Sequence, residues 1–289
     1  MRKYFFMMSL MLGLVVSGML FVSCGDDEEP TLATEQGDKG GEQGGNGDSN
    51  DENGGNSGNQ TDEDKSGVID GREYVDLGLP SGTLWATMNV GASKPEDYGD
   101  YFAWGETVPY GGEDNSNAMN YAYAGTYVKT YYDWSTYKYC KGSYSTLIKY
   151  CNNSSYGFNG YTDELGELLP EDDAATANWS AAWRIPSNSQ FSELLNGNYT
   201  MAEFTKLNGV SGCKITSIKN GNSIFLPVTG IVRNANIERQ GENGQYWART
   251  YSISKAYRAN GLELTPTYHN DDIGISRCSG CSVRPVRNL

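Results

Sequence analysis

The sequence of residues 69–289 predicts an α+β domain with many short strands, two short helices and long loops. Segments with the alternating or continuous apolar pattern of strands outnumber helical segments, and turn residues separate most of them. A tyrosine-rich middle stretch, roughly 98–161, shows little periodicity. We expect its tyrosines to pack long structured loops, with sugar stacking as the alternative. A segment of this length can bury a substantial core, so we expect one globular domain.

The clearest helix signal lies in PSNSQFSELLNGN, residues 186–198. Ser187 or Asn188 can cap the N-terminus, and Gly197 can end the helix. Between them, one phenylalanine and two leucines share a face. This pattern predicts a short amphipathic helix.

A second helix is expected within LPEDDAATANW, residues 169–179. Pro170 suits the first turn of a helix, and the acids Glu171, Asp172 and Asp173 suit its N-terminus, where the helix dipole is positive. The same three carboxylates are candidate calcium ligands, but they lack the fixed spacing of a calcium loop. We therefore expect no cofactor, with calcium as the alternative.

Strand patterns occur in seven further segments. They are EYVDLGL (73–79), TLWATMNV (83–90), GCKITSI (212–218), SIFLPVTG (223–230), QYWARTYSI (245–253), ANGLELT (259–265) and CSVRPVR (281–287). In the segment 245–253, alternation places Trp247, Arg249, Tyr251 and Ile253 on one face. Because Trp247 is expected in the core, Arg249 and Tyr251 reach solvent only if the strand ends or bends after Trp247.

The N-terminus has the three-part pattern of a secretory signal peptide. Two basic residues precede an apolar run from Tyr4 to Val22, which ends at Ser23-Cys24. The string FVSCGDDEE resembles a bacterial lipobox followed by the surface-export signal of Bacteroidetes-type lipoproteins. We therefore predict a lipoprotein signal peptide over residues 1–23 and lipidation of Cys24, which anchors the protein to a membrane. An uncleaved anchor is the alternative, since the apolar run is nearly long enough to span a bilayer.

After the lipidated Cys24, residues 24–68 are expected to form a disordered acidic tether. They are rich in Gly, Asn, Asp, Glu, Gln and Ser and contain too little apolar surface to offset the chain entropy of folding. Residues 25–68 carry a net charge of −11 out of the chain's −14, and residues 1–24 carry +2. The remaining −5 on residues 69–289 is mildly acidic, so we expect no nucleic-acid partner.

Eight strings of the domain occur in an order that resembles a known family. They are EYVDLGLPSGTLWATMNVGA, GDYFAWGET, YCKGSYSTLIKYC, LPEDDAATANW, AWRIPSNSQFSELL, NGNSIFLPVTG, GQYWAR and SVRPVR. Together they cover nearly all of residues 73–287 and resemble the Fibrobacter succinogenes major paralogous domain, a family common in surface lipoproteins. The domain is also similar to the C-terminal domain of Legionella collagen-like adhesins. The resemblance implies a C-type-lectin-like fold, with a small mixed or antiparallel sheet, two flanking helices and long loops, but it does not fix a function.

Motifs of common enzymes are absent from the sequence: it has no H-E-x-x-H, no P-loop and no G-x-S-x-G. His269 is the only histidine, and its setting, TYHNDD, indicates an exposed loop. We therefore predict that the protein is not an enzyme.

Six cysteines are present, and removing Cys24 leaves five, which cannot all pair within one chain. Cys140 and Cys151 flank a ten-residue loop. We predict a disulfide between them, which stabilises the fold by roughly 2–3 kcal/mol. Cys213 and the two cysteines of a C-x-x-C then compete for a second pairing.

The C-x-x-C consists of Cys278 and Cys281. A zinc site needs a second such pair or two histidines, and the chain has neither, so we expect no metal site. A thioredoxin-like pair opens a helix, whereas this one precedes a strand pattern. Related formylglycine-generating enzymes use cysteines near the C-terminus, so an oxidase or redox site here is the enzymatic alternative.

In lectin-like domains the last third of the chain usually builds the exposed binding face, which corresponds here to residues 245–276. Relatives typically carry Ser and Asn in this region, whereas this chain carries eight candidate ligand contacts: Arg249, Tyr251, Tyr257, Arg258, Tyr268, His269, Asp271 and Asp272. Tyr, Arg and His make adaptable contacts in recognition surfaces. The difference between these residues and the Ser and Asn of relatives resembles what a diversity-generating retroelement produces. Ordinary sequence drift in loops is the alternative.

Taken together, these features predict a lipid-anchored protein of the outer membrane, exposed on the cell surface, that binds a protein or glycan through its C-terminal loops. Two alternatives stand beside this one. The first is a structural component of a surface assembly such as a pilus tip. The second is an oxidase or redox enzyme that uses Cys278 and Cys281.

Overall fold

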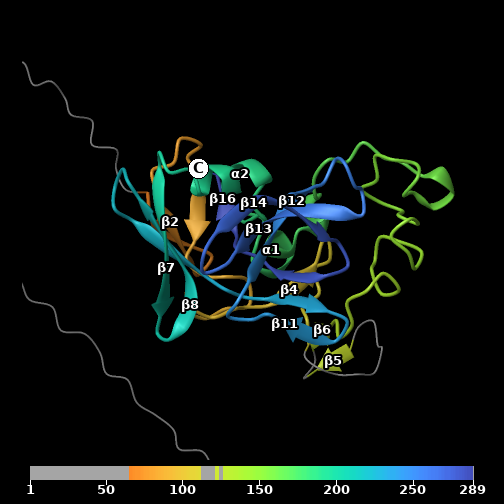
Figure 1. The fold of residues 1–289 in the computed structure, drawn as a ribbon, viewed down its shortest axis with the longest axis horizontal. Helices are drawn as coiled ribbons and strands as arrows, with labels where there is room; N and C mark the ends of the chain where they lie inside the picture. Colours follow the sequence, from red (N-terminus) through yellow and green to blue (C-terminus); the bar gives the residue numbers. More distant parts are fainter. Residues whose placement is uncertain (1–64, 112–120, 124–125, 289) are drawn as a thin grey trace, which may run out of the picture. The chain divides into compact units, whose positions relative to one another are not determined.

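Antiparallel strands, two short α-helices and long loops make up the fold (Figure 1). The structure is a computed structural model that describes residues 65–111, 121–123 and 126–288. The expected signal peptide, the lipidation site Cys24 and the tether up to residue 64 lie outside these ranges. The described part of the chain is α+β with mostly antiparallel sheets, as predicted, and none of its helices has the length and hydropathy needed to cross a membrane.

The first sheet joins the beginning and the end of the described chain. It runs in the order β1-β2-β3-β16 and is antiparallel throughout. Its strands are β1 (Gly67–Ile69), β2 (Arg72–Asp76), β3 (Leu84–Ala86) and β16 (Val286–Arg287). Strand β1 starts at Gly67, two residues before the expected boundary at residue 69.

The largest sheet has seven strands in the order β11-β10-β15-β12-β13-β14, with β4 paired to β15. Strand β15 is its junction, since it pairs antiparallel with β10 and β4 and parallel with β12. The bounds are β4 (Tyr101–Ala103), β10 (Ile231–Arg233), β11 (Asn236–Glu238), β12 (Gly244–Tyr251), β13 (Arg258–Leu264), β14 (His269–Ser276) and β15 (Gly280–Ser282).

Two smaller sheets complete the strand list. One pairs β5 (Tyr121–Tyr123) with β6 (Thr126–Val128), and the other has the order β7-β8-β9. Its strands are β7 (Thr200–Leu207), β8 (Val210–Ser217) and β9 (Ser223–Pro227). Asn208 and Gly209 both have positive φ in the tight turn between β7 and β8, a conformation that these two residue types tolerate.

Both predicted helices are confirmed. Helix α2 (Asn188–Leu194) has Ser187 as its N-cap, and a reciprocal capping box with Gln190 satisfies two backbone N–H groups. Helix α1 (Ala174–Asn178) has Asp173 as its N-cap and follows a 3-10 turn, η2 (Pro170–Asp172). A second 3-10 turn, η1 (Phe158–Gly160), lies in the long loops.

All three candidate calcium ligands have other partners, and Glu171 Oε1 lies 3.8 Å from Lys149 Nζ. Asp173 caps α1, and the buried carboxylate of Asp172 accepts hydrogen bonds from Lys149 Nζ (2.5 Å), Tyr150 (2.6 Å) and Tyr139. Burial alone would raise the pKa of Asp172, but these donors outweigh it and hold the pKa below its ordinary value. The two carboxylates thus have structural roles in the loop region.

Each of the seven predicted strand segments contains a strand, but two long strands were not predicted. Strand β7 follows α2 directly, and β14 includes His269, so the interpretation of TYHNDD as a loop is wrong for residues 269–272. Strand β14 is the edge of its sheet, and most of its side chains are exposed or half-buried. An edge strand of this kind has no apolar face that sequence could show.

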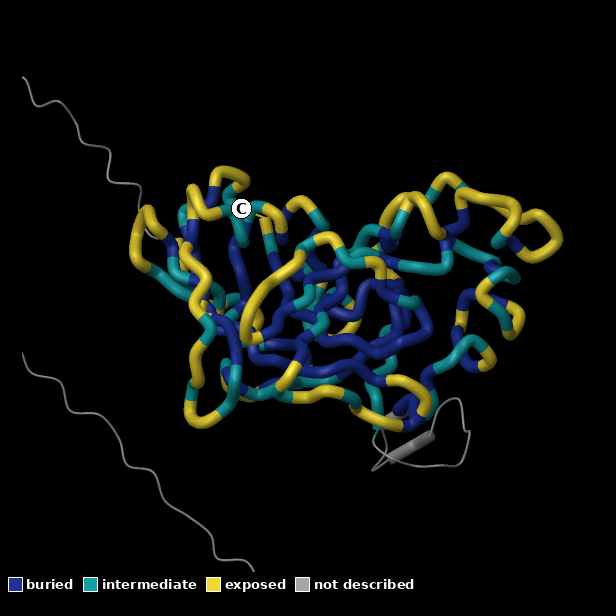
Figure 2. Tube along the Cα trace, in the orientation of Figure 1, coloured by how far each residue is buried: buried dark blue, intermediate teal, exposed yellow. Residues whose placement is uncertain are grey.

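Strand β12 separates two hydrophobic clusters. Trp247 and Tyr251 pack into one of them, and Tyr246 and Ala248 into the other. The pairing of β12 with β13 shifts register between Trp247 and Tyr251, although both residues stay in the same cluster. Figure 2 shows the buried residues at the centre of the domain, with the exposed ones along the hairpins and loops.

Candidate binding face

The eight predicted ligand-binding residues do not form one surface. The pairs Arg258–Ser276 and Leu264–His269 mark opposite ends of the β13–β14 hairpin, which at roughly 3.3 Å per residue are about 20 Å apart. The residues lie as follows: Arg249 and Tyr251 on β12, Tyr257 and Arg258 at the start of β13, Tyr268 and His269 at the hairpin turn, and Asp271 and Asp272 on β14.

Tyr251 does not project from the surface as the prediction requires. The side chain is 6% exposed, and its ring packs against Trp104 and the guanidinium of Arg277, with 4.8 Å between the ring centroid and Arg277 Cζ. Tyr251 belongs to the same hydrophobic cluster as Trp247, as the alternation along this segment places it. Tyr251 is therefore mainly a packing residue that presents only an edge to solvent.

Tyr257 belongs to a group of aromatic rings from the long loops. Its ring lies edge-on to Tyr144, Tyr156 and Trp134, with centroids 5.2–6.5 Å apart. The guanidinium of Arg258 covers the same ring at 5.7 Å. The tyrosines of the middle stretch thus pack the loops against β13, as expected.

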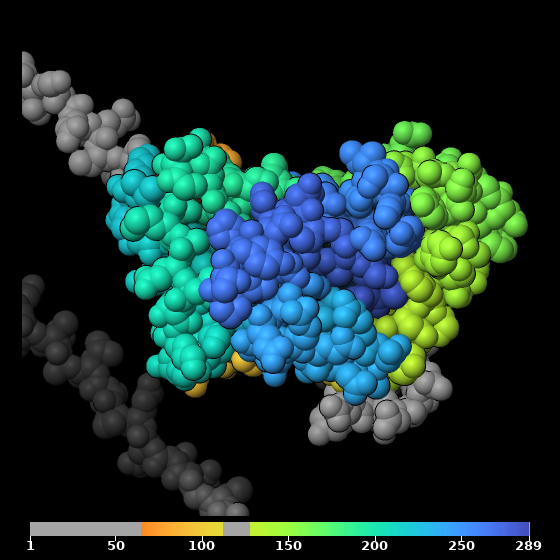
Figure 3. Space-filling view, in the orientation of Figure 1, coloured from red at the N-terminus to blue at the C-terminus, as the bar shows by residue number. Residues whose placement is uncertain are grey.

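A cleft of about 550 Å³ lies where these loops meet α2 and the C-terminal strands. It is formed by loop residues 152–166, by the start of α2, and by the ends of β12 and β13; its lining residues are Asn152, Asp163, Glu164, Gly166, Ser187, Asn188, Ser189, Thr250, Tyr251, Ile253 and Asn260. Four of these belong to the predicted region 245–276. Figure 3 shows the C-terminal residues, in blue, beside the green loops on this face.

Two polar atoms in the cleft lining have no protein partner. Thr250 Oγ1 and Asn188 Oδ1 are both buried without a hydrogen bond. Asn188 is held from its other side, because its Nδ2 donates to Asp272 Oδ1 at 3.3 Å. Asp272 therefore orients a cleft residue, although the sequence prediction gave it a direct ligand contact.

The remaining cleft residues supply both polar and apolar contacts. Asp163 is fully used within the protein, since it accepts hydrogen bonds from the backbone N–H groups of Tyr150 (2.6 Å) and Cys151 (2.9 Å). Ile253 is 83% exposed at the rim. Uncommitted hydroxyl and amide groups beside an exposed apolar side chain suit a neutral, hydroxyl-rich ligand.

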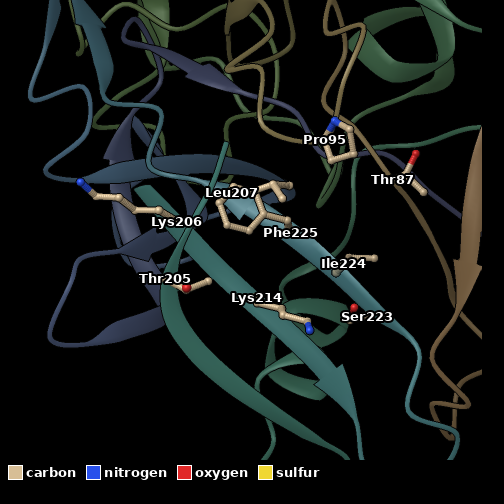
Figure 4. A pocket seen from close by; sticks show the side chains of 9 residues that line it. All are labelled: Thr87, Pro95, Thr205, Lys206, Leu207, Lys214, Ser223, Ile224 and Phe225. Atoms are coloured by element: carbon tan, nitrogen blue, oxygen red, sulfur yellow. The ribbon is translucent and has the colours of Figure 1, made fainter. Parts of the chain in front are cut away.

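A second groove, of about 380 Å³, lies on the outer face of the β7-β8-β9 sheet (Figure 4). Its floor includes Phe225, whose ring lies over Gly212; a Cβ on that glycine would come within 2.3 Å of the ring. Lys206 and Lys214 stand at its sides. None of the predicted site residues lines this groove.

The five described cysteines are all buried free thiols. The predicted disulfide between Cys140 and Cys151 is not formed in the structure, where the two sulfurs point to different carbonyls, of Trp134 at 3.0 Å and of Asn153 at 3.2 Å. Within the described ranges, no three His, Cys, Asp or Glu side chains gather as a metal site would require.

The C-x-x-C pair lacks the environment of a reactive thiol. Burial raises the pKa of Cys278 to about 11 and the pKa of Cys281 well above its ordinary value. Cys281 lies on β15 opposite Phe102 of β4 and is fully buried. A thiolate, which redox chemistry needs, is disfavoured at both positions.

Native alkylation tests this conclusion. We expect Cys278 and Cys281 to react with iodoacetamide at pH 7.5 at least about 100-fold more slowly than an exposed cysteine, because so little thiolate is present. Both should react fully after denaturation, as mass spectrometry of the peptides would show. Selective labelling of either cysteine in the folded protein would instead support a redox site.

Comparisons of the chain with protein-family models, with curated proteins and with solved structures find no match.

Proposed function

We propose that this protein is a non-catalytic binding module, anchored by a lipid on Cys24 to the outer membrane and exposed on the cell surface. Its domain is C-type-lectin-like and belongs to the Fibrobacter succinogenes major paralogous domain family. The resemblance of the eight strings supports this assignment, and the antiparallel sheets, two short helices and long loops are consistent with it.

The cleft beside α2 is the observation that carries the proposal. Four of its eleven lining residues belong to the predicted C-terminal region, and it contains two buried polar atoms without partners. Buried polar groups are normally satisfied, so unsatisfied ones in a cleft indicate where a ligand contributes the missing partner. Because the free groups are hydroxyls and amides, a glycan is the favoured ligand and a protein the second choice.

The proposal does not include diversification by a retroelement, because the eight residues are spread over several places on the domain. A structural role in a surface assembly stands as the alternative. The observation in its favour is β7, which pairs only with β8 among the described strands and exposes most of its residues. Such an edge can accept a strand from another chain.

Binding assays on the full-length chain test the cleft. We expect specific binding to one or more members of a glycan array or a panel of surface proteins, with equal signals in calcium and in EDTA. Ile253→Asp and Asn260→Ala should each weaken that binding by roughly tenfold or more, since each alters a contact within the cleft.

Ile218→Asp is the matched control, because Ile218 is 54% exposed beyond the end of β8 and away from the cleft lining. It should bind like the unmodified protein. The proposal fails if the unmodified chain binds neither the glycan array nor the protein panel. It also fails if Ile253→Asp and Ile218→Asp bind with equal affinity.

A further inference from the structure

Three arginines line a small pocket on the other side of α2's first turn from the cleft. The pocket has a volume of about 280 Å³, and Arg184, Arg249 and Arg287 surround it together with Gln190 and Asn288. Neighbouring residues line the two hollows, since Thr250 and Ser189 face the cleft while Arg249 and Gln190 face the pocket.

Arg249 is fixed in place by three hydrogen bonds. Its Nε donates to Glu167 Oε2 at 2.7 Å, and its Nη1 donates to Gln190 Oε1 at 2.9 Å and to the Ile185 carbonyl at 3.2 Å. The sequence prediction of Arg249 as a ligand contact is thus consistent with its position, but it faces this pocket and not the cleft.

The other two arginines are only partly satisfied. Arg184 reaches Glu167 with Nη2 at 3.6 Å, and Arg287 lies over the ring of Tyr74 at 4.9 Å. The Nε atoms of both arginines are buried and have no hydrogen-bond partner. Two buried N–H donors therefore lack an acceptor in the lining of one pocket.

The charge of the pocket is opposite to that of the protein. Three guanidinium groups share one carboxylate, Glu167, which pairs with two of them. The pocket is thus cationic by about two charges in a chain whose net charge is −14. Such a local excess concentrates anions, even on an acidic protein.

We propose that this pocket binds an oxyanion, namely the phosphate or sulfate group of a larger ligand. Guanidinium forks match the oxygen geometry of these groups, and an ammonium or a single lysine would not. A bound oxyanion would accept from guanidinium N–H groups of the lining arginines, two of which have an Nε–H without a partner in the protein, and balance the excess positive charge. The inference is independent of what the neighbouring cleft binds.

Calorimetric titration of the full-length chain with inorganic phosphate and with sulfate, at constant ionic strength in chloride, tests the site. We expect saturable binding with a Kd in the millimolar range or tighter. The anion with the higher affinity shows whether the larger ligand carries a phosphate or a sulfate group. Arg184→Gln and Arg287→Gln should each weaken binding by about tenfold. Arg233→Gln, which changes an arginine that pairs with Glu238 on another part of the domain, should have no effect.

Glu167→Gln provides a test in the opposite direction, because removing the one carboxylate should strengthen anion binding. Equal affinity in Glu167→Gln and in the unmodified chain, or no saturable binding in either, would overturn the proposal. Ile253→Asp should leave phosphate binding unchanged, which separates this result from the test of the cleft.

Discussion

Replacing Lys129 with methionine is expected to lower the free energy of unfolding by about 3–5 kcal/mol. Lys129 Nζ lies 2.8 and 2.9 Å from the two carboxylate oxygens of Glu106 and 3.1 Å from the Thr136 carbonyl. Both side chains are buried, at 1% and 9% exposure. Methionine has nearly the same length but cannot donate a hydrogen bond, so Glu106 would be left charged and unpaired in the core.

The same ion pair positions the loop that follows β6. Glu106 also accepts the backbone N–H of Lys138 at 2.8 Å, so the pair holds the segment that carries Trp134 of the aromatic group around Tyr257. We therefore expect Lys129→Met to loosen this loop as well as to lower the stability of the domain.

Guanidinium chloride unfolding at pH 7 measures the stability effect. Lys138→Met is the matched control, because that side chain is 54% exposed and its loss should cost less than about 1 kcal/mol. The double variant Lys129→Met/Glu106→Gln should recover part of the loss, since no charge is then left unpaired. A loss below 1 kcal/mol for Lys129→Met would show that water or a rearranged donor replaces the ammonium.

Replacing Arg284 with leucine is expected to cost at least about 3 kcal/mol, because buried acceptors would lose their donors. Arg284 is fully buried. Its Nε donates to Asn89 Oδ1 at 2.9 Å, and its Nη2 donates to the Phe225 carbonyl at 2.9 Å. Its Nη1 lies 3.2 Å from the carbonyls of Ala86 and Thr87.

Arg284 thereby connects the segment after β3 with β9. Burial lowers the pKa of Arg284 to about 10, so the group is still charged at neutral pH. Lysine would supply the charge without the fork of donors, and Arg284→Lys should therefore lose about 2 kcal/mol or more. Thermal and chemical unfolding followed by circular dichroism would measure both variants.

Arg233→Leu serves as the control for Arg284→Leu, since Arg233 has a 49% exposed side chain and pairs with Glu238, which is also exposed. The free energy of unfolding of Arg233→Leu should lie within about 0.5 kcal/mol of that of the unmodified protein. Equal stability of Arg284→Leu and Arg233→Leu would mean that the four carbonyl and amide acceptors find water once the guanidinium is gone.

Local signals explain which parts of the fold could be predicted from sequence. Ser187 and Asp173 cap helices through side chains that contact the next few residues, so their effect is readable without tertiary structure. Strands with one or two buried faces carry apolar patterns, and each of the seven predicted segments contains a strand, although the short buried strands β4 and β10 were not predicted. Strand β14 was missed because its hydrogen bonds to β13, rather than an apolar face, keep it extended.

The candidate site was predictable only in part, because it is assembled from distant segments. Thr250 and Asn260 fall in the region expected to bind, but Asn152 and Ser189 reach the same cleft through the fold alone. Tyr251 packs inward beside Trp247, as alternation along the strand indicates, so its choice as a ligand contact did not follow from the pattern. The arginine pocket was invisible in sequence, because Arg184 and Arg287 come together only through the bridge between Arg184 and Val286.

The pairing of β16 with β3 sets an order of events in folding. Val286 lies opposite Trp85, so the sheet that begins at Gly67 is complete only when the last described strand arrives. Contacts between residues so far apart in the chain close a large loop, and folds dominated by them form slowly. A ribosome or a translocation channel that still held the C-terminal residues would keep Trp85 without its partner strand. The domain is therefore expected to stay unfolded until nearly all of it has emerged, which is the state in which a chain can be threaded through a membrane.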